Sequence, residues 1–450
     1  MTEGRISAFS EERCDRCGIC FQRCPVLQLP LEEARKEIAN LIEGRNSEYV
    51  LDRCTSCMSC NCYCPQQANP YQLILERWND RYQQRGAPPL YRFVCPTEEP
   101  NIWQLINVFL SDQEKKWITQ WMTAVPQPTD QVLLIGNYTH LFPFILGGSR
   151  LLDFFKPVDR IDQWEGGAYL YQGGFLDDVR RIAERTKADF DEWGVSTIVT
   201  PLEALHHIFS AVHPDEMGVA HRMNFVNFHD WLLEQIDDGT IPLKDLQLAV
   251  TVHDNCYSKV AGERYWETPR EILRRCGCEI LEMAHIKEDA LCCGFGAGAS
   301  WVRNMSIPFD IISEGKKKIR EAEDTGAALV SYCSGCIYLL WASRELLGSD
   351  IDIYHIVEVV RMAMGERLNY PEDHLKRAWD VIAIITYQLL ISLFQRNFRI
   401  TEITFDSDLS TFHPKRYPLL KMIRFLFRSR IVRKIYAALF RLLMPVMKTR

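Results

Sequence analysis

The chain has 450 residues, a formal net charge of −7 and a hydrophobic fraction of 47%. This length allows about two to four domains of roughly 100–200 residues each, and the composition is that of an ordinary globular protein. The negative charge argues against nucleic acid as the main partner, because neutralising a phosphate backbone requires a basic surface.

Seventeen cysteines set this chain apart from an ordinary globular protein. The first residues, MTEGRISAFSEERC, lack the basic and apolar regions of a secretory signal. We therefore expect a cytoplasmic protein whose thiols stay reduced. Clustered cysteines in such a protein indicate metal or redox sites rather than disulfides.

Two cysteine motifs of identical spacing lie near the N-terminus. They are Cys14-x-x-Cys17-x-x-Cys20-x-x-x-Cys24-Pro25 and Cys54-x-x-Cys57-x-x-Cys60-x-x-x-Cys64-Pro65. Both resemble the run of bacterial two-cluster ferredoxins, in which the fourth cysteine reaches the other [4Fe–4S] cluster. The resemblance assigns one cubane to Cys14, Cys17, Cys20 and Cys64, and the other to Cys54, Cys57, Cys60 and Cys24. Zinc and disulfides are the alternatives.

The segment between the motifs, LEEARKEIANLIEG, has the spacing of an amphipathic helix. Small ferredoxins generally have β-hairpins at this point, so the helix resembles the α-helical ferredoxin domain of fumarate reductase iron–sulfur subunits. We expect residues 1–90 to form such a domain. Cys62 is surplus to the second motif, and we interpret it as a spectator, with substitution for a ligand as the alternative.

Residues 91–130 are rich in proline and tryptophan and have no clear periodicity, which is typical of a linker. Cys95 is predicted to be a buried thiol rather than a ligand. Beyond this segment, apolar runs alternate with helical stretches. The predicted strands are QVLLIG, AYLYQ and STIVT, followed by LQLAVTVHD, CEILEMA and AALVSYC. The predicted helices are DDVRRIAERTKADFDEWG, ETPREILRRCG and SIPFDIISEGKKKIREAEDTG.

This alternation indicates α/β units on a mostly parallel sheet. The two sets of strands suggest one unit used twice, with repeats at residues 131–245 and 246–365. The expected fold class is therefore multidomain: a small all-α ferredoxin-like domain, a duplicated α/β domain, and a helical C-terminal extension at residues 366–450.

A second group of cysteines falls in the later repeat, after predicted strands. It consists of Cys256, then Cys292-Cys293-Gly294, then Cys333-x-x-Cys336. Loops that follow the strands of an open α/β sheet converge at one edge, where such sheets place their sites. We therefore expect these five cysteines to form a second site.

This pattern resembles the cysteine-rich CCG domain of the heterodisulfide reductase family, over about residues 130–365. The order of ferredoxin and CCG domains is similar to the methanogen catalytic subunit and to the iron–sulfur subunit of anaerobic glycerol-3-phosphate dehydrogenase. The resemblance implies a noncubane [4Fe–4S] cluster held by Cys256, Cys292, Cys293, Cys333 and Cys336. Zinc is the alternative, because four of these thiolates suffice for a tetrahedral site. Cys276 and Cys278 are predicted to be buried thiols.

The earlier repeat has no cysteines at the matching positions. LLIGNYTHLF, YQGGFLDD and TPLEALHH stand there instead, and Gln172, Gly173 and Gly174 keep only the glycine turn. The resemblance implies two facing noncubane clusters that split a disulfide, so the loss of one site counts against that chemistry here. His253 and Asp254 precede Cys256 and are candidates for hydrogen bonds that tune its cluster.

The C-terminal extension contains an apolar run and a basic run. The apolar run, residues 381–394, is too short for a bilayer core of ~30 Å and predicts a buried or interfacial helix. Residues 415–450 hold eleven Lys or Arg and no acidic residue, with apolar residues between them at roughly helical spacing. A basic amphipathic helix is typical of binding to a membrane surface. Docking on an acidic partner subunit and a solvated helix are the alternatives.

These observations predict an iron–sulfur electron-transfer subunit of a heterodisulfide-reductase-like complex. Single electrons would pass from a flavoprotein through two cubanes to the CCG cluster, and then to a quinone, a partner subunit or a disulfide. No flavin or nicotinamide motif is recognisable, so a partner should supply the two-electron chemistry. The alternatives are a catalytic disulfide reductase and a zinc-containing assembly module. We expect a cytoplasmic protein, peripheral to the membrane if the basic extension binds lipid or a quinone-reducing partner.

Overall fold

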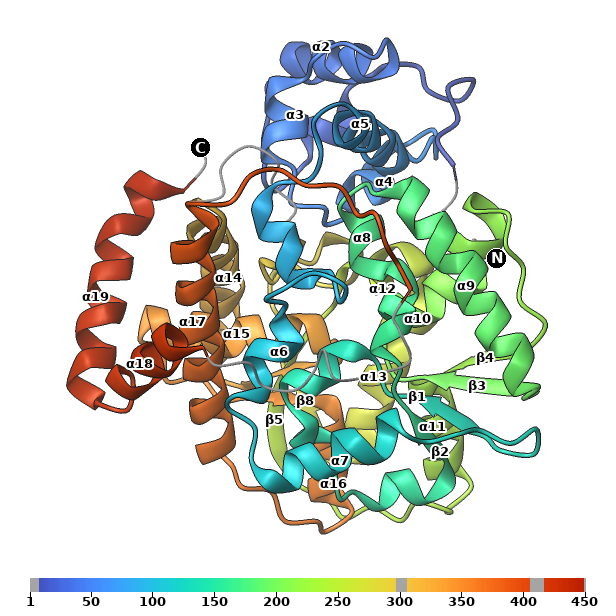
Figure 1. Cartoon of the computed structure of the whole chain (residues 1–450), viewed down its shortest axis with the longest axis vertical. Coiled ribbons are helices and arrows are strands. Elements are labelled where there is room, and N and C mark those ends of the chain that lie inside the picture. Colours follow the sequence, from blue (N-terminus) through green and yellow to red (C-terminus); the bar gives the residue numbers. More distant parts are fainter. Residues whose placement is uncertain (1–7, 297–305, 405–416, 449–450) are drawn as a thin grey trace.

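The computed structural model describes residues 8–296, 306–404 and 417–448. Within these ranges, a small helical N-terminal unit lies at one end of the molecule (Figure 1). Two four-stranded parallel sheets, each with helices around it, form the larger part. The C-terminal helices line one side (Figure 1). The protein is thus helix-rich, with separate helical and α/β parts.

The N-terminal unit consists of five helices: α1 (Ile19–Gln22), α2 (Leu31–Ile42), α3 (Glu48–Arg53), α4 (Ser59–Tyr63) and α5 (Pro70–Arg85). The helix predicted between the two cysteine motifs is confirmed as α2. Its buried residues include Ala34, Ile38 and Leu41, whose spacing places them on one face. This stripe anchors α2 to the core and leaves Glu32, Arg35 and Lys36 exposed, whereas Glu37 is buried.

The segment at residues 91–130 contains two helices that the sequence did not reveal, α6 (Ile102–Asn107) and α7 (Asp112–Met122). Each begins with a capping box, made by Asn101 with Gln104 and by Ser111 with Glu114. These reciprocal hydrogen bonds stabilise short helices. Nearly all of α6 is buried, so it lacks the alternation of apolar and polar residues from which a helix is predicted.

The first sheet has the order β2-β1-β3-β4, with all strands parallel. Its strands are β1 (Val132–Leu134), β2 (Lys156–Val158), β3 (Thr197–Thr200) and β4 (Asn224–Asn227), and its main helices are α8 (Ala168–Gln172), α9 (Leu176–Trp193), α10 (Glu203–His207) and α11 (Phe228–Asp237). The prediction that AYLYQ forms a strand was wrong, because these residues form α8. A short, fully buried apolar run fits a helix as well as a strand.

The second sheet repeats the same order, as β6-β5-β7-β8, again with all strands parallel. Its strands are β5 (Leu248–His253), β6 (Cys278–Ile280), β7 (Ala328–Ser331) and β8 (Ile353–His355), and its helices are α12 (Cys256–Ala261), α13 (Glu263–Arg275), α14 (Ile307–Thr325), α15 (Ser334–Leu347) and α16 (Ile356–Ala363). The predicted strands β5, β6 and β7 and the predicted helices α13 and α14 are confirmed. The short edge strand β8 was missed.

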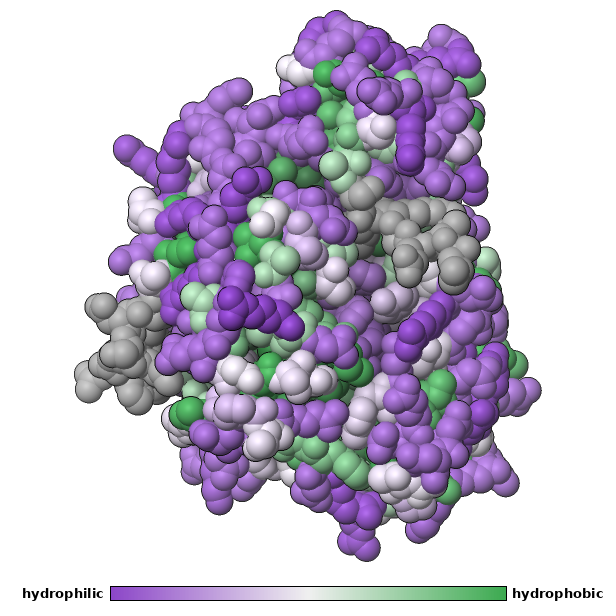
Figure 2. All heavy atoms as spheres, turned by 90° about the vertical axis from the view of Figure 1, so that its right-hand side faces the viewer, coloured by the Kyte–Doolittle hydropathy of each residue, from purple (hydrophilic) through white to green (hydrophobic). Residues whose placement is uncertain are grey.

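The C-terminal helices are α17 (Glu372–Ser392), α18 (Pro418–Leu426) and α19 (Arg430–Met447). The apolar run predicted to form a helix is the second half of α17, which packs against α15. The basic run forms two helices rather than one. Among the described helices, none is long and apolar enough to span a bilayer. The side of the molecule shown in Figure 2 is mostly hydrophilic, with apolar side chains in small separate areas.

An extended segment after α17 ties the N-terminal unit to the first sheet (Figure 1). Phe398 pairs with Ala87 through two backbone hydrogen bonds of 2.7 and 3.1 Å. Further along, the carbonyl of Ile403 accepts hydrogen bonds from Trp164 and Arg185. The segment therefore bonds to the end of the N-terminal unit and to the helices around the first sheet.

Candidate metal centres

The two N-terminal cysteine loops follow the same backbone path. Two and four residues after the first cysteine, each loop has a residue with positive φ: Arg16 (58°) and Gly18 (78°) in one, and Ser56 (54°) and Met58 (63°) in the other. Left-handed residues within a right-handed stretch turn successive N–H groups to one side and form anion-binding concavities that are common at iron–sulfur sites. Both loops therefore have the backbone to hold an anionic cluster.

The structure brings Cys64 to the first loop. Together with Cys14, Cys17 and Cys20 it lines one small cavity. Burial raises the pKa of Cys20 well above its usual value, and the neighbouring thiols, Cys64 first among them, raise it further. The fourth cysteine of the second motif thus lies beside the three cysteines of the first, as a two-cluster arrangement requires.

The reciprocal set is formed by Cys24 with Cys54, Cys57 and Cys60. Burial raises the pKa of Cys24 to about 12, with Cys57 as the next cause. Burial also raises the pKa of Cys54 and Cys60, and thiols of the same set add to it. Backbone N–H groups point at the sulfurs, from Ser56 to Cys54 at 3.4 Å and from Leu27 to Cys24 at 3.4 Å. Such bonds favour the thiolate form that binds metal.

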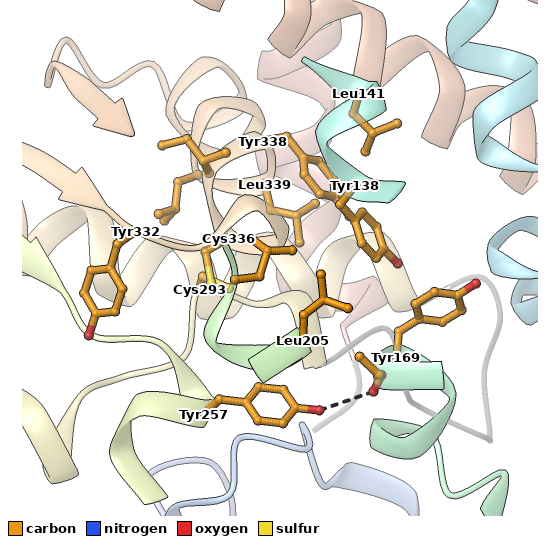
Figure 3. Close-up of a cluster of buried hydrophobic side chains, with 14 of the residues drawn as sticks. Tyr138, Leu141, Tyr169, Leu205, Tyr257, Cys293, Tyr332, Cys336, Tyr338 and Leu339 are labelled. Atoms are coloured by element: carbon orange, nitrogen blue, oxygen red, sulfur yellow. Dashed lines mark hydrogen bonds between the residues drawn. The ribbon is translucent and has the colours of Figure 1, made fainter. Parts of the chain in front are cut away.

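The five cysteines of the later repeat converge on a single cavity of about 60 Å³. Cys256 begins α12 just after β5, Cys333 is the N-cap of α15 just after β7, and Cys336 lies in the first turn of α15. Cys292 and Cys293 reach the same cavity from the long loop after β6. The expected convergence at one edge of the sheet is therefore present, and Figure 3 shows Cys293 and Cys336 side by side.

Hydrogen bonds to sulfur also surround this third set. The N–H groups of Gly294 and Phe295 lie 3.3 and 3.5 Å from the sulfurs of Cys292 and Cys293. Hydrogen bonds from Cys292 and Cys336 lower the pKa of Cys293, whereas burial raises the pKa of Cys256 to about 12. The lowered pKa of Cys293 favours its thiolate form, and a metal that binds such a group of thiols displaces their protons.

His253 lies closer to this set than the sequence indicated. One of its ring nitrogens and the sulfurs of Cys293 and Cys336 all lie within 4.8 Å of one another. Burial lowers the pKa of His253, which favours the neutral imidazole that binds metals. The sequence signal was its position at the end of β5, three residues before Cys256. His253 is therefore a candidate ligand as well as a candidate hydrogen-bond donor.

Asp254 supports the Cys256 loop through a buried ion pair. Burial alone would raise its pKa, but the hydrogen bonds and charge of Arg270 hold the pKa below its usual value. The two groups form a bidentate pair at 2.8 and 2.9 Å. Tyr332 also donates to Asp254, at 2.9 Å. With these contacts, Asp254 positions the loop rather than facing the sulfurs as a ligand.

The second N-terminal loop packs directly against the third set of cysteines. A Cβ atom on Gly296 would lie 1.7 Å from the carbonyl oxygen of Thr55, so only glycine fits there. Between the two loops lies Lys259, whose side chain is 2% exposed. Its ammonium group donates to Ser59 Oγ at 2.8 Å and to the Ala290 carbonyl at 3.0 Å.

Lys259 is a buried cation that faces thiols from both sides. Burial alone would lower its pKa, but the nearby thiols, Cys57 and Cys292 foremost, raise it. Cys62 donates a weak hydrogen bond to the Lys259 carbonyl at 3.5 Å. The surplus cysteine of the second motif therefore contacts the junction between the two loops.

Residues of the earlier repeat also face the third set. Gln172 Nε2 donates to the sulfur of Cys256 at 3.2 Å, and the Gln172 carbonyl accepts from Ser56 Oγ at 2.8 Å. Tyr138, which follows β1, and Leu202, which follows β3, line the same cavity. An amide, a phenol ring and an alkyl group thus stand opposite the five cysteines.

The remaining cysteines lie apart from the three sets. Cys95, Cys276 and Cys278 are buried, and none of them lines the cavity of the first N-terminal set or that of the CCG set. Cys95 donates to the carbonyl of Tyr91 at 3.2 Å. The prediction that these three are buried thiols is confirmed.

A family profile described as "Cysteine-rich domain" (CCG) matches residues 250–340, a range that contains all five cysteines of the third set. Residues 250–340 form a CCG domain. The resemblance that the sequence indicated is thereby confirmed for this part of the chain. Several proteins are similar in sequence to a longer part of this chain than the CCG domain.

Three such relatives are redox proteins by name. One of the subunits of dihydromethanophenazine:CoB–CoM heterodisulfide reductase from Methanosarcina acetivorans is 26% identical over 45% of this chain and 50% of its own length. The probable iron–sulfur-binding oxidoreductase FadF from Bacillus subtilis is 29% identical over 50% of this chain and 27% of its length. EtfAB:quinone oxidoreductase from Syntrophomonas wolfei is 24% identical over 44% of this chain and 27% of its length.

The chain thus spans half or less of the length of these relatives. Among solved structures, a hypothetical protein from Helicobacter pylori matches with a TM-score of 0.41 and 13% identity, covering 76% of this chain and 64% of its own.

Proposed function

We propose that this chain is an iron–sulfur electron-transfer subunit of a heterodisulfide-reductase-like redox complex. Two [4Fe–4S] cubanes would bind to the two N-terminal sets of cysteines, and a noncubane [4Fe–4S] cluster would bind to the CCG set. Electrons from a flavoprotein partner would pass singly through the cubanes to the CCG cluster and on to a quinone, a partner subunit or a disulfide.

The contact between the second cubane loop and the CCG domain carries this proposal. Electron transfer between clusters requires that they lie close together, and Thr55, Ser59, Lys259 and Gly296 bring the two loops into direct contact. A buried cation between two anionic clusters lowers their mutual repulsion, which assists an electron that arrives at either one. This arrangement supports a relay in which the CCG cluster is the last centre.

Thiolates, backbone N–H groups and burial suit an iron–sulfur cluster at the CCG site. Zinc remains the alternative, because it needs only four ligands and His253 could complete a set with three thiolates. Two facing noncubane clusters are not supported, since no cysteine occurs between Cys95 and Cys256. For this reason we favour electron transfer over catalytic disulfide reduction.

Metal analysis of the anaerobically purified chain tests the proposal. Three clusters predict about 12 iron atoms per chain and no zinc, whereas two cubanes and a zinc site predict about 8 iron and one zinc. A Cys336→Ser variant should lose about 4 iron atoms. Cys276→Ser, which removes a buried thiol outside the three sets, is the matched control and should keep all 12. About 8 iron with one zinc in the wild type would exclude the relay to a CCG cluster.

The C-terminal helices support a peripheral position at the cytoplasmic face of a membrane. The buried face of α19 is apolar, and large apolar side chains on α18 and α19 are also exposed on the outer side. They include Phe425 (66%), Ile431 (71%), Leu442 (73%) and Val446 (78%). Basic side chains lie among them. Each Lys or Arg near the surface of a bilayer that contains anionic lipid contributes ~1 kcal/mol to binding.

Sedimentation with vesicles distinguishes lipid from a protein partner on this surface. The chain should bind phosphatidylglycerol vesicles, bind phosphatidylcholine vesicles less, and lose binding in a Leu442→Glu, Val446→Glu double variant. Val125→Glu, at a 69% exposed apolar residue far from these helices in sequence, is the control. Equal sedimentation of wild type and double variant would favour docking on an acidic partner subunit.

A further inference from the structure

An apolar cavity of about 130 Å³ adjoins the cavity of the CCG cysteines. The two share Tyr138, Tyr169, Gln172, Phe295 and Gly296 as walls, so these residues lie between them. The remaining walls come from residues 90–94, from α6, α14, α15 and α17, and from Leu141. An apolar cavity of about 150 Å³ admits a benzene ring. The size therefore suits one aromatic-sized ring.

Three polar atoms in the wall of this cavity have no hydrogen-bond partner within the described part of the chain. They are the hydroxyls of Tyr138 and Tyr169 and the amide nitrogen of Gln388. Each of these side chains is more than nine-tenths buried, at 5%, 6% and 7% exposure. A buried donor without an acceptor costs about 1–3 kcal/mol. Three such donors around one apolar space indicate a ligand that carries hydrogen-bond acceptors.

The two tyrosines stand between this space and the CCG cysteines. The ring of Tyr138 meets that of Tyr169 edge to face at 5.6 Å and stacks on that of Tyr338 at 6.1 Å. Figure 3 shows Tyr138 between Tyr338 and Tyr169. Tyr138 also lies in the segment that follows β1, as Cys256 lies in the segment that follows β5 in the second sheet. The wall of the cavity therefore includes a residue from a segment of the earlier repeat that has no cysteine.

We propose that this cavity binds the head group of a quinone. A quinone is a flat apolar ring with two carbonyl oxygens, which would accept hydrogen bonds from Tyr138, Tyr169 or Gln388. Its apolar tail would run along the end of α17 and the residues just after it, where Leu390, Leu393 and Phe394 are 43%, 54% and 89% exposed. They follow Gln388 and Leu389 of the cavity wall in sequence and are exposed to solvent.

The inference rests on the proposed function and names its electron acceptor. The quinone would take two electrons, one at a time, from the CCG cluster and two protons from water to become the hydroquinone. The flavoprotein donor would replace both electrons through the cubanes. A quinone ring in this cavity would be separated from the cysteines of the CCG site by the thickness of one side chain. That distance is short enough for electron transfer.

Equilibrium dialysis of the anaerobic holoprotein against menadione and decylubiquinone tests this site. Ile384 on α17 lines the cavity, so Ile384→Trp should fill it and weaken the binding of both quinones at least about tenfold. Tyr138→Phe keeps the ring and removes one donor, and should weaken binding about five- to tenfold. Leu375→Trp adds the same side chain to α17 at a 38% exposed residue outside the cavity, and should bind as the wild type does.

Iron content and the EPR spectra of the reduced clusters are recorded for every variant. If Ile384→Trp and Tyr138→Phe bind both quinones as tightly as the wild type, the site is elsewhere and the inference is overturned. If dodecanoate binds to wild type and Tyr138→Phe equally while neither quinone binds, the cavity is an acyl-chain site, which also overturns it. In both cases about 12 iron atoms per chain would leave the electron-transfer proposal intact. Loss of the CCG iron from the wild type would instead contradict the proposed function.

Discussion

Removing the buried charge of Lys259 should lower the reduction potential of the clusters on either side of it. Its ammonium group is 2.8 Å from Ser59 Oγ, which is 3.4 Å from the sulfur of Cys57, so charge and sulfur are at most about 6 Å apart. Reduction adds a negative charge to a cluster, and a nearby cation stabilises the reduced form. Lys259→Met keeps the length of the side chain and removes only the charge.

The size of the effect follows from Coulomb's law. At separations of about 6 to 9 Å and an effective dielectric constant of about 20, one unit charge contributes about 2–3 kcal/mol. For a one-electron couple, ~1.4 kcal/mol corresponds to ~59 mV, so the potential should fall by roughly 80–120 mV. The burial of Lys259 at 2% exposure justifies a dielectric constant well below that of water.

Potentiometric titration followed by EPR measures this shift. Lys259→Arg should retain most of the potential, and Lys317→Met, which removes an exposed lysine on α14, should leave it unchanged because solvent screens that charge. Iron content is measured in parallel, so that loss of a cluster is not mistaken for a shift. Unaltered potentials in a Lys259→Met protein with a full complement of iron would refute the claim that this cation lies between two clusters.

Three further predictions concern a buried carboxyl group, a buried ion pair and cluster assembly. Burial raises the pKa of Glu165 from 4.5 to about 7. Between these two pH values the folded state binds more protons than the unfolded state. The free energy of unfolding should therefore fall as pH rises, by up to about 3 kcal/mol. Glu165→Gln should remove this fall in urea unfolding at pH 5 and pH 8, and an unchanged slope would contradict the assignment. Arg270→Met should cost about 3–5 kcal/mol in the same assay because it leaves Asp254 buried and unpaired, and a loss below about 1 kcal/mol would show the pair to be dispensable. Cys64→Ser should remove one cubane, about 4 iron atoms, whereas Cys62→Ser should keep all iron; equal losses would make Cys62 a ligand.

The sequence by itself determined the features that depend on local spacing. The two N-terminal motifs predicted paired sets of cysteines, and the structure brings Cys64 to the first set and Cys24 to the second. The stripe of Ala34, Ile38 and Leu41 predicted α2. Apolar runs predicted five strands correctly, and the cysteines after β5 and β7 indicated the convergence of the CCG site. These features could be predicted because helical and strand periodicity and ligand spacing are properties of short segments.

Only the tertiary structure decided what faces the clusters. The run AYLYQ indicates a strand although it forms α8, because a run that is buried on all sides has no periodicity to read. Lys259 gave no signal, since a lysine in a short helix is ordinarily solvated and its burial depends on Ser59, 200 residues away. Gln172, Tyr138 and Gln388 are likewise brought together by packing between segments distant in sequence. Spacing along the chain therefore predicted which residues could bind clusters, while packing across the chain decided their surroundings, the charge between them and the cavity beside them.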